Sequence, residues 1–275
     1  MQEQALDRAV IAVMRDAADR AIMPRYQSLS AHDIIDKDPG ARLLDLVTVA
    51  DKESEVILAE GLAKILPEAA IVGEEAAHAD PSVLDGLGAP LCWIIDPVDG
   101  TNNFASGKPP FGILVALAAH GETIGGWIFD PLKNRLCHAH KGQGAWVDGE
   151  RVTSRGSGQT PPIAAISFVF ADEAERAALK AQIAPHYTTV DIPRCAAEQY
   201  PRIVLGENDL TIFSRTLAWD HAAGVLFVNE AGGKVARPDG RPYLVPEHMQ
   251  NGLLGASSPA LWDELAARIA GMVKG

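Results

Sequence analysis

The spacing of apolar residues divides the chain into an N-terminal helical part, a central run of strands and a C-terminal part in which the two alternate. Within residues 1–26 the apolar positions recur at helical spacing, which predicts an amphipathic helix. A second helix is expected from Thr48 to Leu66, because Thr48 with Asp51 three residues later resembles a capping pair. Pro67 then ends this helix.

Predicted strands dominate the middle of the chain. Short apolar runs bounded by turn residues are typical of buried strands, and Asp148-Gly149 is a strong signal for a two-residue hairpin turn. The expected strands are Ala70–Gly73, Leu91–Ile95, Phe111–Ala119, Gly125–Phe129 and Leu136–His140, followed by a hairpin over Ala145–Val152.

The small, polar segment Gly156–Pro162 is the best candidate boundary within the chain. Beyond it strands alternate with helices, which indicates an α/β arrangement. We therefore expect a single unit with halves at about residues 1–155 and 156–275. The second half is expected to contain a strand over Ile163–Phe170, a helix over Asp172–Ile183, a further strand and helix, a helix over Trp219–Ala231, a strand over Leu253–Ala256 and a helix from Pro259 to Val273.

Composition excludes several classes of protein. With 275 residues, 47% of them apolar and 22% charged, the chain has the balance of a globular protein with a sizeable core. Its net charge of −12 argues against a general affinity for nucleic acid, because that affinity depends on Lys and Arg. No apolar stretch is long enough to span a membrane, and the three cysteines form no CxxC pair. We expect a protein of a reducing compartment, the cytoplasm, that contacts neither nucleic acid directly nor membrane.

Four acidic segments stand apart from the ordinary charged surface. The most informative runs from Asp96 to Thr101, where Pro97 and Gly100 force a turn directly after an apolar strand. This turn can aim the two carboxylates and the intervening carbonyl at one point, and such oxygen ligands are those that Mg²⁺ prefers. A short helix beginning at Thr101 would also suit an anion at its N-terminus. The other three segments contain Asp51, Glu74-Glu75 and Asp220.

Each acidic segment taken alone has an ordinary structural explanation. Asp-Pro and Asp-Gly pairs are common in turns, and Glu74-Glu75 alone is typical of a solvated loop. Thr48 with Asp51 alone is typical of a helix cap, and Asp220 alone is an acid in the first turn of a helix. The occurrence of all four segments in this order is what indicates a shared site.

In this combination the chain resembles the inositol monophosphatase family of metal-dependent, lithium-sensitive phosphatases. The matching segments are Asp45–Asp51, Gly73–Glu75, Trp93–Phe104 and Trp219–Gly224. The resemblance implies a layered αβαβα fold of the inositol monophosphatase and fructose-1,6-bisphosphatase type. It also implies a homodimer, inhibition by Li⁺, and Mg²⁺-dependent hydrolysis of a small phosphate monoester, with inositol monophosphate as the default substrate.

The resemblance assigns metal ligands by position. Glu74, Asp96 and the carbonyl of Val98 would bind a first Mg²⁺, and Asp96, Asp99 and Asp220 would bind a second. A third, weaker ion would depend on Glu74 through water. The site would therefore hold two to three Mg²⁺ ions.

The resemblance also assigns catalytic groups. Thr101, together with Glu74 or through a contact with Asp51, would activate the attacking water, and the backbone N–H groups of Gly100 and Thr101 would hold the phosphate. Metal ions make this attack feasible because they lower the pKa of bound water and neutralise the phosphoryl group. The chain has neither a GxSxG nucleophile elbow nor a P-loop, and His221 is interpreted as a packing histidine.

The substrate side departs from the inositol-preferring pattern. A Gly-Ser/Thr-Ala-Ala run is replaced by Arg194-Cys195-Ala196-Ala197, and an acidic residue that binds an inositol hydroxyl is replaced by Phe213. Together with Asp220, the positions of Arg194, Cys195, Ala196 and Phe213 are the expected substrate contacts. Either the backbone of the loop differs or the Arg194 guanidinium enters the pocket. Because a phenyl ring cannot accept that hydrogen bond, we expect a pocket that is not tuned for inositol.

Several substrates and one function of another class stay open. Family members also act on histidinol phosphate, fructose bisphosphate or other sugar phosphates, and 3′-phosphoadenosine 5′-phosphate, and Arg194 and Arg215 could meet a second anionic group or be surface arginines. Some bacterial members are partners of the transcription machinery. The chain has no basic patch with interleaved aromatic residues, so such a role would depend on docking to protein rather than to RNA.

Overall fold

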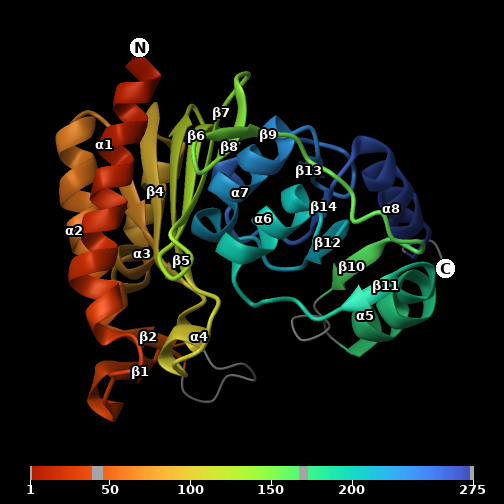
Figure 1. Ribbon diagram of the computed structural model, residues 1–275, viewed down its shortest axis with the longest axis horizontal. Helices are drawn as coiled ribbons and strands as arrows, with labels where there is room; N and C mark the ends of the chain where they lie inside the picture. The colour runs from red at the N-terminus through yellow and green to blue at the C-terminus, as the bar shows by residue number, and fades with distance from the viewer. Residues whose placement is uncertain (1, 39–45, 167–172, 273–275) are drawn as a thin grey trace.

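A computed structural model of the chain describes residues 2–38, 46–166 and 173–272. Asp45, the first residue of the first matching motif, lies outside the described residues, as do the predicted ends at Phe170, Asp172 and Val273. The described elements form alternating layers of helix and sheet (Figure 1). The layered αβαβα fold implied by the family resemblance is confirmed.

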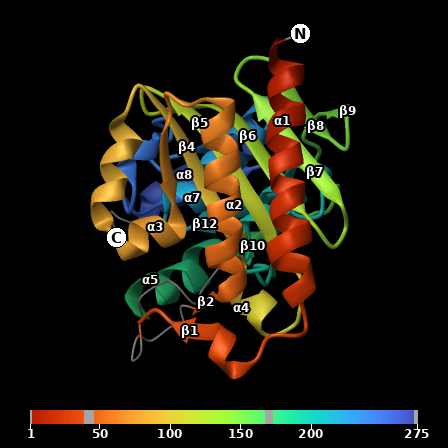
Figure 2. The same cartoon turned by 90° about the vertical axis from the view of Figure 1, so that its left-hand side faces the viewer.

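Two long helices form the first layer and cover one face of a large sheet (Figure 2). These are α1 (Gln2–Ala17) and α2 (Val49–Ile65). Val10 and Met14 of α1 are fully buried against this face, in a core that includes Trp93. Helical conformation continues to Arg25, close to the predicted end at Tyr26, but as a π-helical turn over Ala18–Ile22 and a 3₁₀ turn over Met23–Arg25 that contains Pro24.

The second layer is a seven-stranded sheet in the order β3-β4-β5-β6-β7-β8-β9. Neighbouring strands are antiparallel except for β3 and β4, which are parallel. The strands are β3 (Ala70–Gly73), β4 (Leu91–Asp99), β5 (Gly112–Ala119), β6 (Glu122–Asp130), β7 (Arg135–His140), β8 (Gly144–Val147) and β9 (Glu150–Val152).

Strand β4 runs further than the predicted Leu91–Ile95 and includes both Asp96 and Asp99. Asp96 pairs with Leu114 and Asp99 with Gly112, so β4 has one residue more than its partner between these two pairs. This is a β-bulge, which bends a strand and redirects its side chains. The bulge therefore places both carboxylates at the C-terminal end of β4.

Two helices form the middle layer, α6 (Ala196–Leu205) and α7 (Ala218–Glu230). They pack closely on each other, because a Cβ at Gly224 would lie 1.9 Å from the ring of Tyr200. They also fill the space between the two sheets, as their buried side chains belong to a core that includes Ile94 and Leu253.

The fourth layer is a mixed five-stranded sheet in the order β11-β10-β12-β14-β13. Its outer face is covered by α5 and α8 at the far side of the molecule (Figure 1). The elements are β10 (Ile163–Ile166), α5 (Glu173–Ala178), β11 (Thr188–Val190), β12 (Leu210–Phe213), β13 (Lys234–Ala236), β14 (Leu253–Ala256) and α8 (Pro259–Met272).

The remaining short elements gather near the end of β4. They are the antiparallel pair β1 (Ile34–Asp36) and β2 (Leu46–Thr48), and the short helices α3 (Glu74–Ala79) and α4 (Thr101–Ala105). The segment Gly156–Pro162 connects β9 of the large sheet to β10 of the smaller one. Within the described ranges, no helix combines the length and apolar character needed to cross a membrane.

Candidate functional site

Three carboxylates from two layers meet at the end of β4. Asp96, Asp99 and Asp220 each offer one oxygen, and these oxygens all lie within 4.8 Å of one another. Asp96 and Asp99 are buried at the β4 bulge, and the partly buried Asp220 comes from the first turn of α7. Among the residues that the structure describes, this is the one such cluster of potential metal ligands.

The electrostatics of this cluster favour a bound cation. Burial raises the pKa of Asp96 well above its usual value, and the charges of Glu74, Asp99 and Asp220 raise it further. Burial also raises the pKa of Asp99 to about 6, although hydrogen bonds such as that from the Ala197 N–H, at 2.6 Å, oppose the rise. Buried like charges at this distance repel one another unless a cation compensates them. The all-oxygen donor set fits a hard divalent ion such as Mg²⁺.

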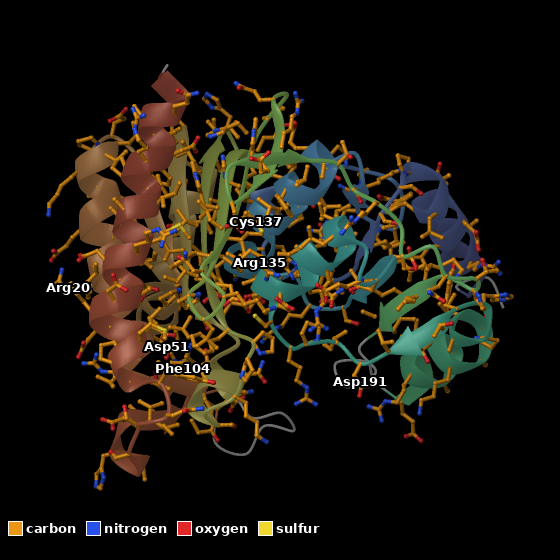
Figure 3. All side chains as sticks on the ribbon, viewed as in Figure 1. Arg20, Asp51, Phe104, Arg135, Cys137 and Asp191 are labelled. Atoms are coloured by element: carbon orange, nitrogen blue, oxygen red, sulfur yellow. The ribbon has the colours of Figure 1, made fainter. Side chains whose placement is uncertain are left out.

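Asp51 joins this site through Thr101. Thr48 is the N-cap of α2, and the fully buried Asp51 completes its capping box, because the N–H and hydroxyl of Thr48 donate to Asp51 Oδ2 at 2.8 and 2.5 Å. The hydroxyl of Thr101 lies 3.0 Å from Asp51 Oδ1 and 2.9 Å from the carbonyl oxygen of Val98. Burial raises the pKa of Asp51 to about 7. Asp51 therefore combines the predicted helix cap with a contact to Thr101, at the α4 end of α2 (Figure 3).

Glu74 lies beside the cluster, and its carboxylate is paired with the ammonium of Lys37. It begins α3 directly after β3, whose Gly73 lies opposite Ile95 of the parallel β4. The Nζ of Lys37 lies 2.8 Å from Glu74 Oε1 and 2.6 Å from Glu75 Oε1. Burial lowers the pKa of Lys37, but the two carboxylates outweigh this effect and raise it, so the ammonium persists. The sequence offered no motif for Lys37, which we did not predict.

A second residue that sequence reasoning missed is Glu55. Its carboxylate accepts hydrogen bonds from the N–H groups of Glu75 and Ala76, both at 2.8 Å, and so caps α3. A Cβ at residue 73 would lie 2.3 Å from the carboxyl carbon of Glu55, so Gly73 leaves the space that this cap needs. Glu55 thereby positions the helix that carries Glu74.

The loop before α6 keeps a glycine-like backbone despite its arginine. Arg194 is exposed and has φ of 52°, in the left-handed region that non-glycine residues seldom occupy. The Nδ2 of Asn103 donates to the carbonyl of Pro193 at 3.0 Å. A Cβ at Gly100 would lie 3.2 Å from the Cβ of Cys195. Arg194 thus lies between Pro193, which is hydrogen-bonded to Asn103, and Cys195, which lies close to Gly100.

Phe213 belongs to an aromatic cluster with Tyr200 and His221, the residue that follows Asp220 in the sequence. Its ring centroid lies 5.3 Å from that of Tyr200 and 4.7 Å from that of His221. Tyr200 donates to Nδ1 of His221 at 2.6 Å, and Nε2 donates to the carbonyl of Arg215 at 3.1 Å. Burial lowers the pKa of His221 to about 3, so this histidine is neutral. His221 is therefore a packing residue, in agreement with its interpretation from sequence.

Comparisons with known proteins point to one family. A model of the inositol monophosphatase family matches residues 3–274. The chain is 30% identical to an inositol-1-monophosphatase of Bacillus subtilis, over 80% of this chain and 82% of the relative. It is 31% identical to a Nus factor SuhB of Pasteurella multocida, over 82% of each chain. It is also 30% identical to a fructose-1,6-bisphosphatase/inositol-1-monophosphatase of Thermotoga maritima, over 76% and 77%.

Solved structures show the same fold. An inositol monophosphatase of Zymomonas mobilis superimposes with a TM-score of 0.79 at 21% identity, over 98% of this chain and 99% of that one. A second, from Thermotoga maritima, gives a TM-score of 0.78 at 24% identity, over 98% of both chains. The family resemblance drawn from the acidic motifs is confirmed, and the chain belongs to the inositol monophosphatase family of phosphatases.

Proposed function

We propose that this protein hydrolyses a small phosphate monoester in a Mg²⁺-dependent reaction at the cluster of Asp96, Asp99 and Asp220. The observation that carries this proposal is the convergence of three carboxylate oxygens within 4.8 Å, with two of the side chains buried. Family membership supports the phosphatase class.

The chain offers ligands for two to three Mg²⁺ ions. Glu74, Asp96 and the Val98 carbonyl would hold one ion, Asp96, Asp99 and Asp220 a second, and Glu74 would support a third. Bound divalent ions lower the pKa of water and neutralise phosphoryl oxygens. In the structure Lys37 already compensates part of the charge of Glu74, at 2.8 Å.

Thr101 and Asp51 would move the proton of the attacking water. The Thr101 hydroxyl takes this proton at Oγ1 and passes its own proton to Oδ1 of Asp51, 3.0 Å away. Because burial raises the pKa of Asp51 to about 7, its carboxylate suits a proton acceptor near neutral pH. Glu74 is the alternative partner of Thr101. The N–H groups of Gly100 and Thr101, at the start of α4, would hold the phosphate.

The proposed substrate contacts do not favour inositol. Arg194 and Cys195 precede α6, which begins at Ala196, and Cys195 lies against Gly100. Phe213 has a ring, and it would replace the acceptor that inositol binding needs. Asp220 would complete the contacts. The exposed guanidinium of Arg194 suits a second anionic group, as in a sugar bisphosphate or 3′-phosphoadenosine 5′-phosphate. The name of the Thermotoga maritima relative, a fructose-1,6-bisphosphatase/inositol-1-monophosphatase, supports including bisphosphates.

A panel of phosphate esters tests both parts of the proposal. Phosphate release is measured from inositol 1-phosphate, histidinol phosphate, fructose 1,6-bisphosphate and 3′-phosphoadenosine 5′-phosphate, with and without Mg²⁺. Asp99→Asn should abolish release, whereas Asp263→Asn, which removes an exposed carboxylate paired with Lys234, should leave it unchanged. No release from any ester would contradict the phosphatase, and a wide preference for inositol 1-phosphate would contradict the substrate assignment.

A docking role with the transcription machinery is the second candidate, because several relatives are named Nus factor SuhB. Such a role would use the protein surface rather than the carboxylate cluster. Binding to purified transcription proteins of the same source should then survive Asp99→Asn. Loss of binding together with activity would contradict a separate docking function.

Three further properties are proposed on family membership. We infer that the protein is a homodimer, that Li⁺ inhibits it and that it resides in the cytoplasm. Sedimentation, hydrolysis at millimolar Li⁺ and cell fractionation test these inferences in turn.

A further inference from the structure

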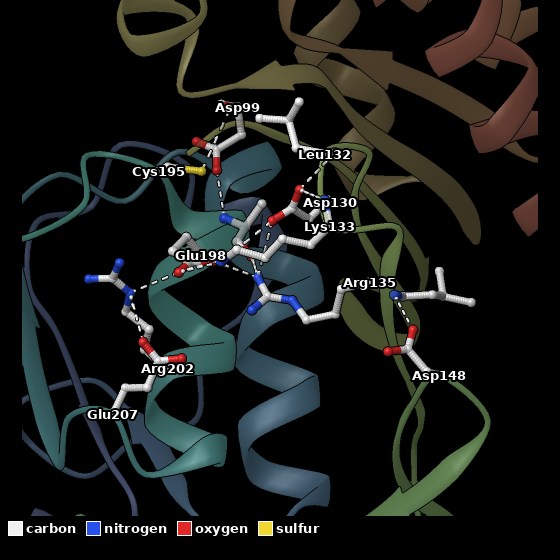
Figure 4. Close-up of polar contacts among 12 residues, drawn as sticks. Asp99, Asp130, Leu132, Lys133, Arg135, Asp148, Cys195, Glu198, Arg202 and Glu207 are labelled. Atoms are coloured by element: carbon white, nitrogen blue, oxygen red, sulfur yellow. Dashed lines mark hydrogen bonds and ion pairs between the residues drawn. The ribbon is translucent and has the colours of Figure 1, made fainter. Parts of the chain in front are cut away.

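A buried carboxylate that the proposed reaction does not use lies next to the metal-ligand cluster. Glu198 is in the first turn of α6, and its side chain is only 3% exposed. Lys133 Nζ lies 3.0 Å from both of its oxygens, Arg135 Nη2 lies 2.6 Å from Oε2, and Arg202 Nε lies 3.0 Å from Oε1 (Figure 4). Glu198 is therefore held from three directions by cations.

Two of these cations flank the same connection: Lys133 lies in the turn between β6 and β7, and Arg135 is the first residue of β7. Asp130 fixes this turn, because its Oδ1 accepts the N–H groups of Leu132 and Lys133, both at 3.0 Å. Its Oδ2 lies 3.7 Å from the Lys133 ammonium and 3.8 Å from the Arg135 guanidinium. The turn thus presents both cations in a set geometry, and Glu198 attaches α6 to the seven-stranded sheet through them.

The same helical turn contacts a candidate metal ligand. The N–H of Ala197, the residue before Glu198, donates to Asp99 Oδ2 at 2.6 Å (Figure 4). This bond occupies one oxygen of Asp99, so the position of the turn decides where the other oxygen points. Glu198 lies between the fixed β6–β7 turn and this hydrogen bond.

Stability alone does not explain such a cluster. The free energy needed to remove several charges from water is about as large as the free energy gained from their attraction. Apolar residues of similar volume often stabilise a protein equally well. A carboxylate bound by three directed donors does, however, fix an orientation, and groups behind a metal ligand tune the affinity for the metal. The contacts of Glu198 therefore suit a role in geometry.

We propose that Glu198 is a positioning residue that holds the Ala197 N–H on Asp99 and so sets the affinity of the site for Mg²⁺. This inference rests on the proposed function, because it takes Asp99 as a metal ligand. Glu198 itself touches neither substrate nor metal.

The test is Glu198→Gln, which keeps the shape of the side chain and removes its charge. We expect the Mg²⁺ concentration for half-maximal hydrolysis to rise about tenfold or more, the usual effect of changing a group behind a metal ligand. The stabilisation of the protein by Mg²⁺ in thermal unfolding should weaken in parallel. Without metal, the amide of Ala197 should exchange its hydrogen faster than in the unchanged protein.

Two controls separate positioning from loss of stability. Glu207→Gln removes the 51% exposed carboxylate at the other side of Arg202, 3.5 Å away, and should leave the Mg²⁺ dependence unchanged. Asp209→Asn removes a buried carboxylate that binds Ser157 and the N–H of Ile163 beyond the far end of α6. It should lower the melting temperature without changing the Mg²⁺ dependence.

A second variant, Arg135→Met, tests the same role of Glu198 if Glu198→Gln does not fold. Arg135→Met removes the 2.6 Å partner and should raise the Mg²⁺ requirement in the same direction. The two changes together should raise it by less than the product of their separate effects, because both act on the Arg135–Glu198 contact. An unchanged Mg²⁺ requirement and Ala197 exchange in a folded variant would overturn the inference. Absence of hydrolysis in the unchanged protein would instead contradict the proposed function. Hydrogen exchange of the Ala197 amide does not depend on hydrolysis, so the two results can be distinguished.

Discussion

The hydroxyl of Thr101 lies 3.0 Å from Oδ1 of Asp51, and this contact joins the first turns of α4 and α2 across 50 residues of sequence. The other oxygen of Asp51 is already bound by Thr48, so the carboxylate is fixed in orientation toward Thr101. A hydroxyl beside a fixed carboxylate can pass a proton without moving. This geometry supports the proposed role of the pair as the proton acceptor of the site.

Removing this pair should lower the rate of hydrolysis rather than the binding of substrate. Thr101→Val should lower kcat by about 10²–10⁴-fold, the range that general acid–base groups contribute, with a small effect on KM. Thr101→Ser should keep much of the activity because it keeps the hydroxyl. Ser106→Ala, which loses only a bond to the Asn102 carbonyl at the end of α4, serves as the control. Steady-state kinetics would contradict the role if Thr101→Val kept its kcat.

The metal-free protein should lose stability as the pH rises. Burial raises the pKa of Asp51 from 3.8 and of Glu55 from 4.5, both to about 7. The folded protein therefore holds more protons than the unfolded chain between about pH 4 and 7, and folding becomes less favourable as these protons leave. Urea unfolding in EDTA at several pH values measures this trend.

Two comparisons make the pH dependence specific. Glu55→Gln should flatten the curve, because the amide cannot ionise. Added Mg²⁺ should stabilise the protein more at pH 8 than at pH 5, since ionised carboxylates bind the cation and protonated ones do not. A metal-free stability that increased steadily from pH 5 to pH 8 would contradict this account.

Local signals in the sequence predicted local structure well. Thr48 and Asp51 form the capping box that their spacing indicates, and Asp148-Gly149 forms the hairpin turn between β8 and β9. The order of strands within each sheet was not predictable from these patterns, because apolar periodicity does not specify which strands pair. Strand β4 was predicted too short, since Pro97 resembles a strand end but lies in a bulge.

The acidic motifs led to the cluster of Asp96, Asp99 and Asp220, but not to the residues that support it. Lys37 is 37 residues from Glu74 in sequence, and Glu55 is 20 residues from the N–H that it caps. Such partners carry no motif of their own, and only the folded chain brings them to the site. The supporting residues were therefore the part that sequence patterns could not supply.

The Glu55 cap predicts an interaction between two substitutions. Gly73→Ala would place its Cβ 2.3 Å from the Glu55 carboxyl carbon, so we expect it to destabilise the protein by about 1–3 kcal/mol through loss of the cap. Glu55→Ala should cost a similar amount. Because Glu55→Ala also removes the clash, the double variant should lose less than the sum of the two. Chemical denaturation of the four proteins checks this, and simple additivity would contradict it.

We expect Arg194 to lower the stability of the protein and to favour substrates that have a second anionic group. Its φ of 52° is strained for an arginine, so Arg194→Gly should stabilise the protein by about 1 kcal/mol. If its guanidinium meets a second anionic group, the same change should lower kcat/KM for fructose 1,6-bisphosphate by about tenfold or more and spare fructose 1-phosphate.

His120→Gly is a matched control for both effects of Arg194→Gly. His120 also has a positive φ, 50°, but it lies in the turn between β5 and β6, away from the carboxylate cluster. Its replacement should raise the melting temperature in the same way, because it relieves the same backbone strain, and leave the ratio of the two substrates unchanged. If Arg194→Gly behaved like His120→Gly in both measurements, Arg194 would be a surface arginine, and the preference for a second anionic group would have to come from other residues.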